Sequence, residues 1–242
     1  MKFINSGILL LSTVFFLLTG CKKDNKADDA YKCTTCATSP EAKPANDGSS
    51  KGIYKGIVIG STGTIKFDIQ NAGTVIKAYL TIDGTSVELT SAITWNGDRA
   101  YTAPFTGLLN GQSVTIQFSV GMDGSEPTIT SATIPGHPNA TFIIAKEAST
   151  ALIECYEGTY HTTKPEDGTF NLILSRSLNL WGAIARQNGQ SETNGVSGVI
   201  VNNKLIGDDG TTTMGTLSND QISGSFKDDN NTTVTIQGKR TL

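Results

Sequence analysis

The chain has few of the residue patterns that mark an enzyme. Two histidines occur among its 242 residues, and they share no local motif. The sequence contains no Gly-x-Ser-x-Gly nucleophile elbow, no His-Glu-x-x-His zinc motif and no phosphate-binding loop. Each of these motifs positions a reactive group by local geometry, so their absence removes the commonest sequence signals of catalysis. We therefore expect a protein that is not an enzyme and that uses no metal ion or cofactor.

The chain also has no large excess of positive over negative charge, or of negative over positive. The formal net charge is −3, and no block of lysines and arginines stands out. Proteins that bind nucleic acid usually concentrate basic residues in a patch or stripe, so a nucleic-acid partner is not expected. Long amphipathic helical patterns are missing as well. A parallel sheet needs crossover connections that are usually helical, so an antiparallel β fold is favoured.

What the sequence does contain is a regular pattern of strands and tight turns. Residues 63–69 alternate strictly, with Ile65, Phe67 and Ile69 on one face, as in a half-buried strand. Further strands are expected at residues 53–59, 75–80, 86–89, 113–120 and 128–134. Asn-Gly or Asp-Gly pairs occur at 83–84, 96–97, 110–111, 123–124, 167–168, 188–189, 194–195 and 209–210. Such pairs tolerate the positive φ angles of hairpin turns, so the pattern indicates an all-β antiparallel meander.

Three landmarks recur in the same order in the two halves of the chain. Each half begins with a Gly-x-Tyr segment, continues with a second glycine-led strand, and later runs from a glycine to a phenylalanine over eleven residues. In the first half the landmarks lie at residues 52–54, 63–69 and 107–118, and in the second at 158–160, 168–174 and 215–226. Matching order and spacing of this kind indicate an internal repeat.

The repeat predicts the domain organisation. We expect two tandem small antiparallel β-barrel or meander units, residues 52–147 and residues 156–242, the second a repeat of the first. The segment between them contains Ala, Leu, Lys and Glu but no Gly or Pro. Because those residues favour helix, we expect the units to be joined by a short helical or irregular linker.

The first twenty residues have the features of a secretory signal peptide. Met1-Lys2 provides a basic start, a short apolar stretch follows, and small residues precede Cys21. The stretch Leu18-Thr19-Gly20-Cys21 resembles the bacterial lipobox. The resemblance implies that residues 1–20 are removed and that the Cys21 thiol receives a diacylglyceryl group. An uncleaved membrane helix is the alternative, but polar residues interrupt the roughly 20 apolar positions that a span requires.

Residues 21–51 are mostly polar, charged or small, and hold almost nothing apolar. Such a composition buries too little surface to offset the entropy of ordering, so it predicts a flexible tether. Residues 22–29 are similar to the acid-containing export segments of Bacteroidota-type lipoproteins. That likeness implies a chain held at the bacterial outer membrane through its N-terminal lipid. The protein would then lie either on the cell surface or on the periplasmic side of that membrane.

The second half resembles the C-terminal domains of uncharacterised Bacteroidota-type lipoproteins. The likeness rests on Glu157-Gly158-Thr159-Tyr160, on residues 168–172 and 222–226, and on a final glycine followed by a basic residue. It implies a small lipocalin- or avidin-like barrel, whose closure removes exposed strand edges. The resemblance brings no catalytic residues with it.

Three cysteines remain besides Cys21. Cys33 and Cys36 form a Cys-x-x-Cys pair in a polar segment, which is compatible with a disulfide, idle thiols, a redox pair or half of a metal site. A structural disulfide or idle thiols are favoured because His137, the nearest histidine, is distant in sequence. Cys155 is expected to be a small buried hydrophobe, with a long-range disulfide as the alternative.

Trp95, Arg99 and Tyr101 are a possible ligand contact. Aromatic rings beside polar and charged groups can hold a sugar or peptide by stacking and hydrogen bonding. The alternative, which we favour, is that Trp95 covers the end of a small core. The sequence therefore predicts a lipid-anchored envelope or cell-surface protein that acts by binding a small molecule, a glycan or an envelope protein. A surface glycan hydrolase and a barrel-type protease inhibitor are the alternatives.

Overall fold

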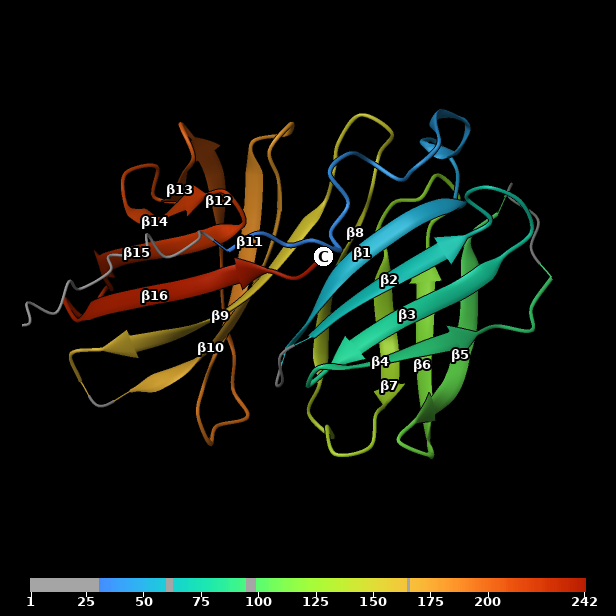
Figure 1. The fold of residues 1–242 in the computed structure, drawn as a ribbon, viewed down its shortest axis with the longest axis horizontal. Coiled ribbons are helices and arrows are strands. Elements are labelled where there is room, and N and C mark those ends of the chain that lie inside the picture. The colour runs from blue at the N-terminus through green and yellow to red at the C-terminus, as the bar shows by residue number, and fades with distance from the viewer. Residues whose placement is uncertain (1–30, 60–62, 95–98, 165) are drawn as a thin grey trace, which may run out of the picture.

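The protein is built of two eight-stranded antiparallel units in tandem, as the computed structural model shows (Figure 1). The structure describes residues 31–59, 63–94, 99–164 and 166–242, so the predicted signal peptide, Cys21 and Trp95 lie outside the described residues. Within the described part of the chain, no helix is long and apolar enough to cross a bilayer. The predicted all-β fold with two tandem barrel-like units is confirmed.

The first unit is a nearly closed barrel with the strand order β7-β6-β5-β4-β3-β2-β1-β8. Its strands are β1 (Gly52–Ile59), β2 (Gly63–Ile69), β3 (Ile76–Ile82), β4 (Thr85–Thr90), β5 (Tyr101–Leu109), β6 (Gln112–Val120), β7 (Thr128–Thr133) and β8 (Thr141–Lys146). Its interior is filled by aromatic rings from several strands. The centroids of the stacked Phe67 and Phe118 rings are 4.3 Å apart, and Tyr54 and Phe105 pack edge-on against this pair.

The second unit is a closed barrel in which β9 pairs with both β10 and β16. Its strands are β9 (Glu154–Thr162), β10 (Asp167–Ser175), β11 (Leu180–Gln187), β12 (Asn194–Val201), β13 (Lys204–Gly207), β14 (Thr213–Ser218), β15 (Gln221–Lys227) and β16 (Thr233–Arg240). Closure leaves no edge strand in this unit, which is the usual way in which a small β protein avoids edge-to-edge aggregation.

Some of the Asn-Gly and Asp-Gly pairs form the expected turns, and others do not. In the hairpins at Asp83-Gly84 and Asn110-Gly111, both residues have positive φ, as type I′ turns require. Asn202-Asn203 makes the same kind of turn without a glycine. Asp167-Gly168 and Asn194-Gly195, which were expected to be turns, instead lie within β10 and β12.

The first two landmarks of the repeat fall on the same strands of the two units, and the last landmark falls on different strands. The two Gly-x-Tyr segments lie in β1 and β9, and the glycine-led strands that follow are β2 and β10. The third landmark falls on the β5–β6 hairpin in the first unit and on the β14–β15 hairpin in the second, one strand later in the order. The units therefore share their architecture, while their later strands are not matched residue for residue.

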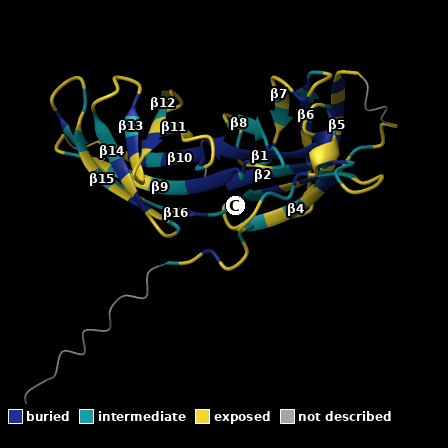
Figure 2. Ribbon diagram, turned by 90° about the horizontal axis from the view of Figure 1, so that it is seen from above, coloured by how far each residue is buried: buried dark blue, intermediate teal, exposed yellow. Residues whose placement is uncertain are grey.

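Strand β1 is buried along its whole length because it serves two cores (Figure 2). Tyr54 and Val58 point into the first barrel. On the opposite face, Ile57 packs with Cys155 and Ile173 of the second barrel in a separate apolar cluster. The outer faces of the two barrels thus pack as two sheets do, with interdigitating apolar side chains between them.

A buried ion pair fastens this junction. Lys55, also on the outer face of β1, donates a 2.7 Å hydrogen bond to Glu147, and neither side chain is exposed to solvent. Glu147 also accepts hydrogen bonds from the backbone N–H groups of Glu41, Ala42 and Ile153. One carboxylate therefore joins the first barrel, the segment before it and the segment that leads into the second barrel.

The segment between the barrels is irregular. Ala148 and Ala151 form an isolated bridge around a turn, and no helix occurs between Glu147 and Glu154. Of the two forms expected for this linker, the structure has the irregular one. Glu147 explains this outcome, since it binds the backbone N–H of Ile153 with its side chain.

Residues 31–51, predicted to belong to a flexible tether, lie against both barrels. Cys33, Ala42 and Asn46 are buried, and η1 (Pro44–Asn46) is a single 3-10 turn within this segment. Asn46 hydrogen-bonds Asn71 of the first barrel. The composition of the segment concealed this arrangement, because its ordering depends on partners 25 or more positions away. We call residues 31–43 the strap.

Replacing Lys55 with methionine tests the ion pair. Lys55→Met keeps the aliphatic volume but leaves the Glu147 carboxylate buried without its cation. We expect a loss of about 3 kcal/mol in the free energy of unfolding, measured by guanidinium denaturation. The matched control is Lys77→Met, which removes the exposed pair of Lys77 with Glu88 and should change little. Equal effects of the two substitutions would contradict the role assigned to the buried pair.

Candidate ligand-binding site

The second barrel encloses a cavity of about 510 Å³ that opens at one end. Most of its wall is apolar. The wall residues are Phe170, Leu172, Trp181, Ala183, Ala185, Val196, Leu205, Met214, Phe226, Val234 and Ile236. Small-molecule sites typically have volumes of about 300–1,000 Å³ and are mostly apolar with a few placed polar groups. We call this cavity the lumen.

The lumen exists because small residues occupy inward positions of the strands. Gly158 and Gly238 are neighbours on β9 and β16, and the ring of Phe170 lies over both. A Cβ atom at Gly238 would lie 2.9 Å from Cζ of Phe170, so the ring keeps its place only while that residue is glycine. Ala183 and Ala185 on β11 add two further short side chains to the wall. An aromatic ring laid over glycines is a recurrent device in curved sheets.

Trp181 is fixed in the wall by two hydrogen bonds. Its indole N–H donates to the carbonyl oxygens of Ile206, at 3.0 Å, and Val199, at 3.2 Å. Gly198 permits this approach, since a Cβ there would lie 3.0 Å from the indole nitrogen. The ring itself is 5% exposed and faces the lumen. Trp181 is thus a rigid apolar surface with its polar atom already satisfied, and it suits contact with an apolar ligand.

The open end of the lumen is acidic. Glu166, Asp228 and Asp229 line it, and these are the charged residues among the described part of the lining. Burial, together with the nearby carboxylates of Glu166 and Asp167, raises the pKa of Tyr160, so its hydroxyl stays protonated at neutral pH. The mouth therefore offers carboxylates and hydroxyl donors around an apolar interior, and it disfavours the entry of anions.

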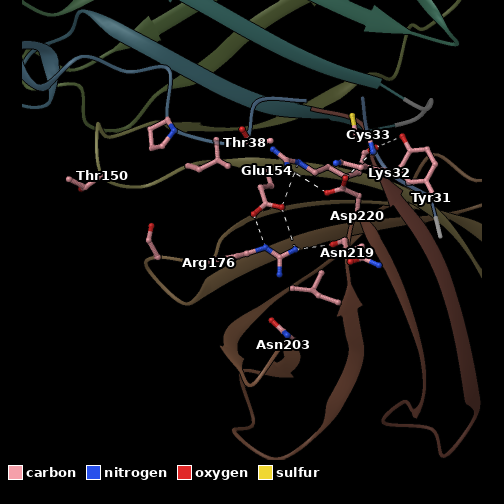
Figure 3. Close-up of a pocket in the computed structure, with 15 residues that line it drawn as sticks. Tyr31, Lys32, Cys33, Thr38, Thr150, Glu154, Arg176, Asn203, Asn219 and Asp220 are labelled. Carbon is pink, nitrogen blue, oxygen red and sulfur yellow. Dashed lines mark hydrogen bonds and ion pairs between the residues drawn. The ribbon is translucent and has the colours of Figure 1, made fainter. Parts of the chain in front are cut away.

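The opposite end of the barrel is sealed by a polar cluster (Figure 3). Arg176 donates to Glu154 from Nε at 2.8 Å and to the hydroxyl of Tyr156 from Nη2 at 3.0 Å. The Tyr156 hydroxyl donates to Glu154 at 2.8 Å. Burial and the adjacent Glu154 carboxylate raise the pKa of Tyr156 well above its usual range, which keeps it a donor. Tyr156 and Leu217 both belong to the buried core of this barrel, so the cluster borders that core.

The strap covers the sealed end. The backbone N–H of Cys33 donates to Asp220 at 2.9 Å, and Arg240 donates to the carbonyl of Ala37 at 2.6 Å. Arg240 also lies 3.6 Å from both Asp220 and Glu154. A cleft of about 820 Å³ separates the strap from the barrel end. The carboxylates of this cleft are held in internal pairs with arginine, so the cluster fastens the strap to the barrel.

Two of the residues expected to contact a ligand in the first unit, Arg99 and Tyr101, differ in their exposure to solvent. Tyr101 is buried in the first core beside Phe118, and Arg99 is exposed. Trp95 lies outside the described residues. The Tyr101 ring faces the core and not an open surface, which differs from the expected contact. The alternation in β5 explains this, since Tyr101, Ala103 and Phe105 share the buried face.

Cys33 and Cys36 form a disulfide with a Cα–Cα distance of 5.4 Å. Cys155 is a free thiol buried at the junction of the barrels. The long-range disulfide considered for Cys155 is therefore not formed. Among the described residues, no group of His, Cys, Asp and Glu side chains is placed to hold a metal ion.

The sequence analysis missed the residues that define the lumen. Phe170, Ala183 and Trp181 belong to no sequence motif of a binding site. Glycines inside strands were the available signal, because Gly158, Gly168 and Gly238 interrupt an otherwise bulky pattern. The sealed end gave no local signal, since Glu154 and Arg176 meet only through the pairing of β9 with β10.

Comparison of the chain with protein families, with curated proteins and with solved structures finds no match. The case for a function therefore rests on the geometry described above.

Cysteine alkylation tests the environment of Cys155. Burial raises the pKa of the Cys155 thiol to about 12, so the reactive thiolate is scarce at pH 8 in the folded protein. We expect iodoacetamide to leave Cys155 unmodified in the native chain and to modify it fully in guanidinium, as measured by peptide mass spectrometry. Rapid alkylation of the native chain at pH 8 would show that the junction opens.

Proposed function

We propose that this protein is a lipid-anchored binding protein of the bacterial outer membrane, and that it holds a small, largely apolar molecule in the lumen of its second barrel. The observation that carries the proposal is the contrast between the two interiors. Aromatic rings fill the first barrel, whereas an apolar cavity of about 510 Å³ remains in the second. A barrel with a hollow interior supports binding of a ligand inside it, and a filled barrel supports a scaffold role.

The construction of the lumen supports binding without catalysis. Its wall is apolar, its single indole N–H is satisfied by backbone carbonyls, and its carboxylates lie at the mouth. An apolar ligand would bury surface against Phe170, Leu172 and Trp181 at a gain of about 25 cal/mol per Å². The acidic mouth favours a neutral or cationic ligand over an anion.

The anchoring part of the proposal rests on the sequence. Leu18-Thr19-Gly20-Cys21 resembles the lipobox, and acylation of Cys21 would hold the chain on a membrane leaflet. Two acyl chains give stable attachment, whereas one gives only marginal binding. A binding protein fixed there would take up or present apolar molecules close to the membrane.

A substitution that fills the lumen with a larger side chain, Ala183→Phe, tests the binding function. The probe is N-phenyl-1-naphthylamine, a neutral apolar dye that fluoresces in apolar surroundings. We expect saturable binding to the native protein and an affinity at least about tenfold lower in Ala183→Phe, because the added ring occupies the space that the probe needs. Titrations followed by dye fluorescence measure both affinities. In a Trp95→Phe background Trp181 is the remaining tryptophan, so quenching of its fluorescence by the bound dye reports contact in the lumen.

The matched control is Leu180→Phe, on the same strand but on the outer face, where the side chain is 53% exposed. This variant should bind the dye as the native protein does. Circular dichroism and thermal melting would establish that both variants are folded. Undiminished binding by a folded Ala183→Phe protein would exclude the lumen as the site.

Mass spectrometry of the protein extracted from its native membrane tests the anchor. We expect an N-terminal peptide that begins at Cys21 and carries a diacylglyceryl group, and Cys21→Ser should abolish the modification and release the protein from the membrane fraction. A chain that retains residues 1–20, or an unmodified Cys21, would contradict the proposed anchoring.

A further inference from the structure

The outer surface of the second barrel carries an apolar patch that neither core uses. Leu178, Leu180, Val199 and Val201 are 56%, 53%, 42% and 48% exposed. These fractions are high for large aliphatic side chains, and the next pair on the same outer face, Gly182 and Ser197, is small and polar. Contiguous exposed apolar surface of this kind marks a contact with another molecule or with a membrane.

The four side chains form one surface. Leu180 and Val199 are direct partners on β11 and β12. The pairing continues past the start of β11, since the backbone N–H of Ile200 donates to the carbonyl of Asn179 at 2.9 Å. Leu178 lies two residues before Leu180 in the turn that leads into β11, and Val201 lies two residues after Val199 on the outer face of β12. We call these four residues the apolar patch.

The apolar patch lies at the sealed end of the barrel, where the chain arrives from its N-terminus. Ser177 and Asn203, which adjoin the apolar patch in the chain, line the cleft under the strap together with Tyr31 (Figure 3). The hydroxyl of Tyr31 donates to the carbonyl of Arg240 at 2.8 Å, which places the start of the described chain at this end. Cys21 precedes Tyr31 by ten positions, a span of at most about 36 Å.

The charges of the second barrel are divided between its two ends. Four connections meet at the mouth, between β9 and β10, β11 and β12, β13 and β14, and β15 and β16. Their acidic residues are Glu166, Asp167, Glu192, Asp208, Asp209, Asp228 and Asp229, against the basic Lys164, Arg186 and Lys227. Around the sealed end Lys32 and Lys204 are exposed, and Lys204 pairs directly with Val201, while Arg176 and Arg240 face the carboxylates of Glu154 and Asp220. Anionic lipid headgroups attract such basic groups and repel the acidic mouth.

From these observations we propose that the apolar patch, with the basic residues beside it, rests on the bilayer to which Cys21 is attached. This contact directs the mouth of the lumen away from the membrane. The inference rests on the proposed lipid anchor, because the short connection to Cys21 is what selects a bilayer over a protein as the occupant. Partial insertion of aliphatic side chains beside basic residues is how interfacial protein surfaces bind anionic membranes.

Site-specific fluorescence on the acylated protein tests this orientation. The full lipidated chain is placed on vesicles of phosphatidylcholine and phosphatidylglycerol that contain a lipid with a nitroxide on its headgroup. Val201→Cys and the control Asn230→Cys, which lies at the mouth, are labelled with bimane, since buried Cys155 does not react. We expect the nitroxide to quench the label at Val201 roughly threefold more strongly than the label at Asn230. Replacing Leu180 and Val199 with serine should remove that difference.

The remaining outcomes separate this inference from the proposals on which it draws. Equal quenching at the two positions in a vesicle-bound protein would overturn the orientation while leaving the anchor and the lumen intact. If the protein taken from its native membrane carries no acyl chain and does not bind the vesicles, the anchor and this inference are overturned together. Doubling of the mass in sedimentation, with the Val201 label shielded in the absence of vesicles, would assign the apolar patch to a second copy of the chain. Dye binding in the lumen should be the same in all of these variants.

Discussion

The arrangement of this protein depends on the burial of β1 on both of its faces. A strand in a barrel normally has one face in the core and one in solvent, which gives alternating apolar and polar residues. In β1, Ile57 continues the apolar run on the outer face, and Lys55 is the single charge within it. The lysine is tolerated because Glu147 binds it and is itself bound by three backbone N–H groups. The two barrels therefore meet along a specific surface.

The different interiors of the two barrels follow from the size of the side chains that point inward. β1 and β9 both begin their repeat with Gly-x-Tyr, and each barrel has eight strands. The first barrel then places Phe67, Phe105 and Phe118 inward, and their stacked and edge-on contacts fill the centre. The second places glycines and alanines at many inward positions, so a single ring such as Phe170 covers several strands without reaching the opposite wall.

The sequence predicted what depends on local pattern. Strict alternation located β2 at Gly63–Ile69, and Asp83-Gly84 and Asn110-Gly111 located two hairpins. The same turn signal was wrong at Asp167-Gly168, because Gly168 there accommodates the neighbouring Tyr160 ring within a strand. Features that depend on distant partners were not predictable in this way. The packing of the strap needs Glu147, and the lumen needs the volumes of residues from several strands at once.

The strap and the lumen are linked through the sealed end of the second barrel. Glu154 and Tyr156 are both buried on β9, and without partners Glu154 would be a buried carboxylate at one end of the barrel, at a large desolvation cost. Arg176 and Arg240 neutralise that end, and Arg240 extends the same network to the carbonyl of Ala37 in the strap. The arginines that pair with the buried carboxylates at this end of the barrel therefore also hold the strap against it. The acidic residues that line the lumen, Glu166, Asp228 and Asp229, thus lie at the end of the barrel opposite to the strap.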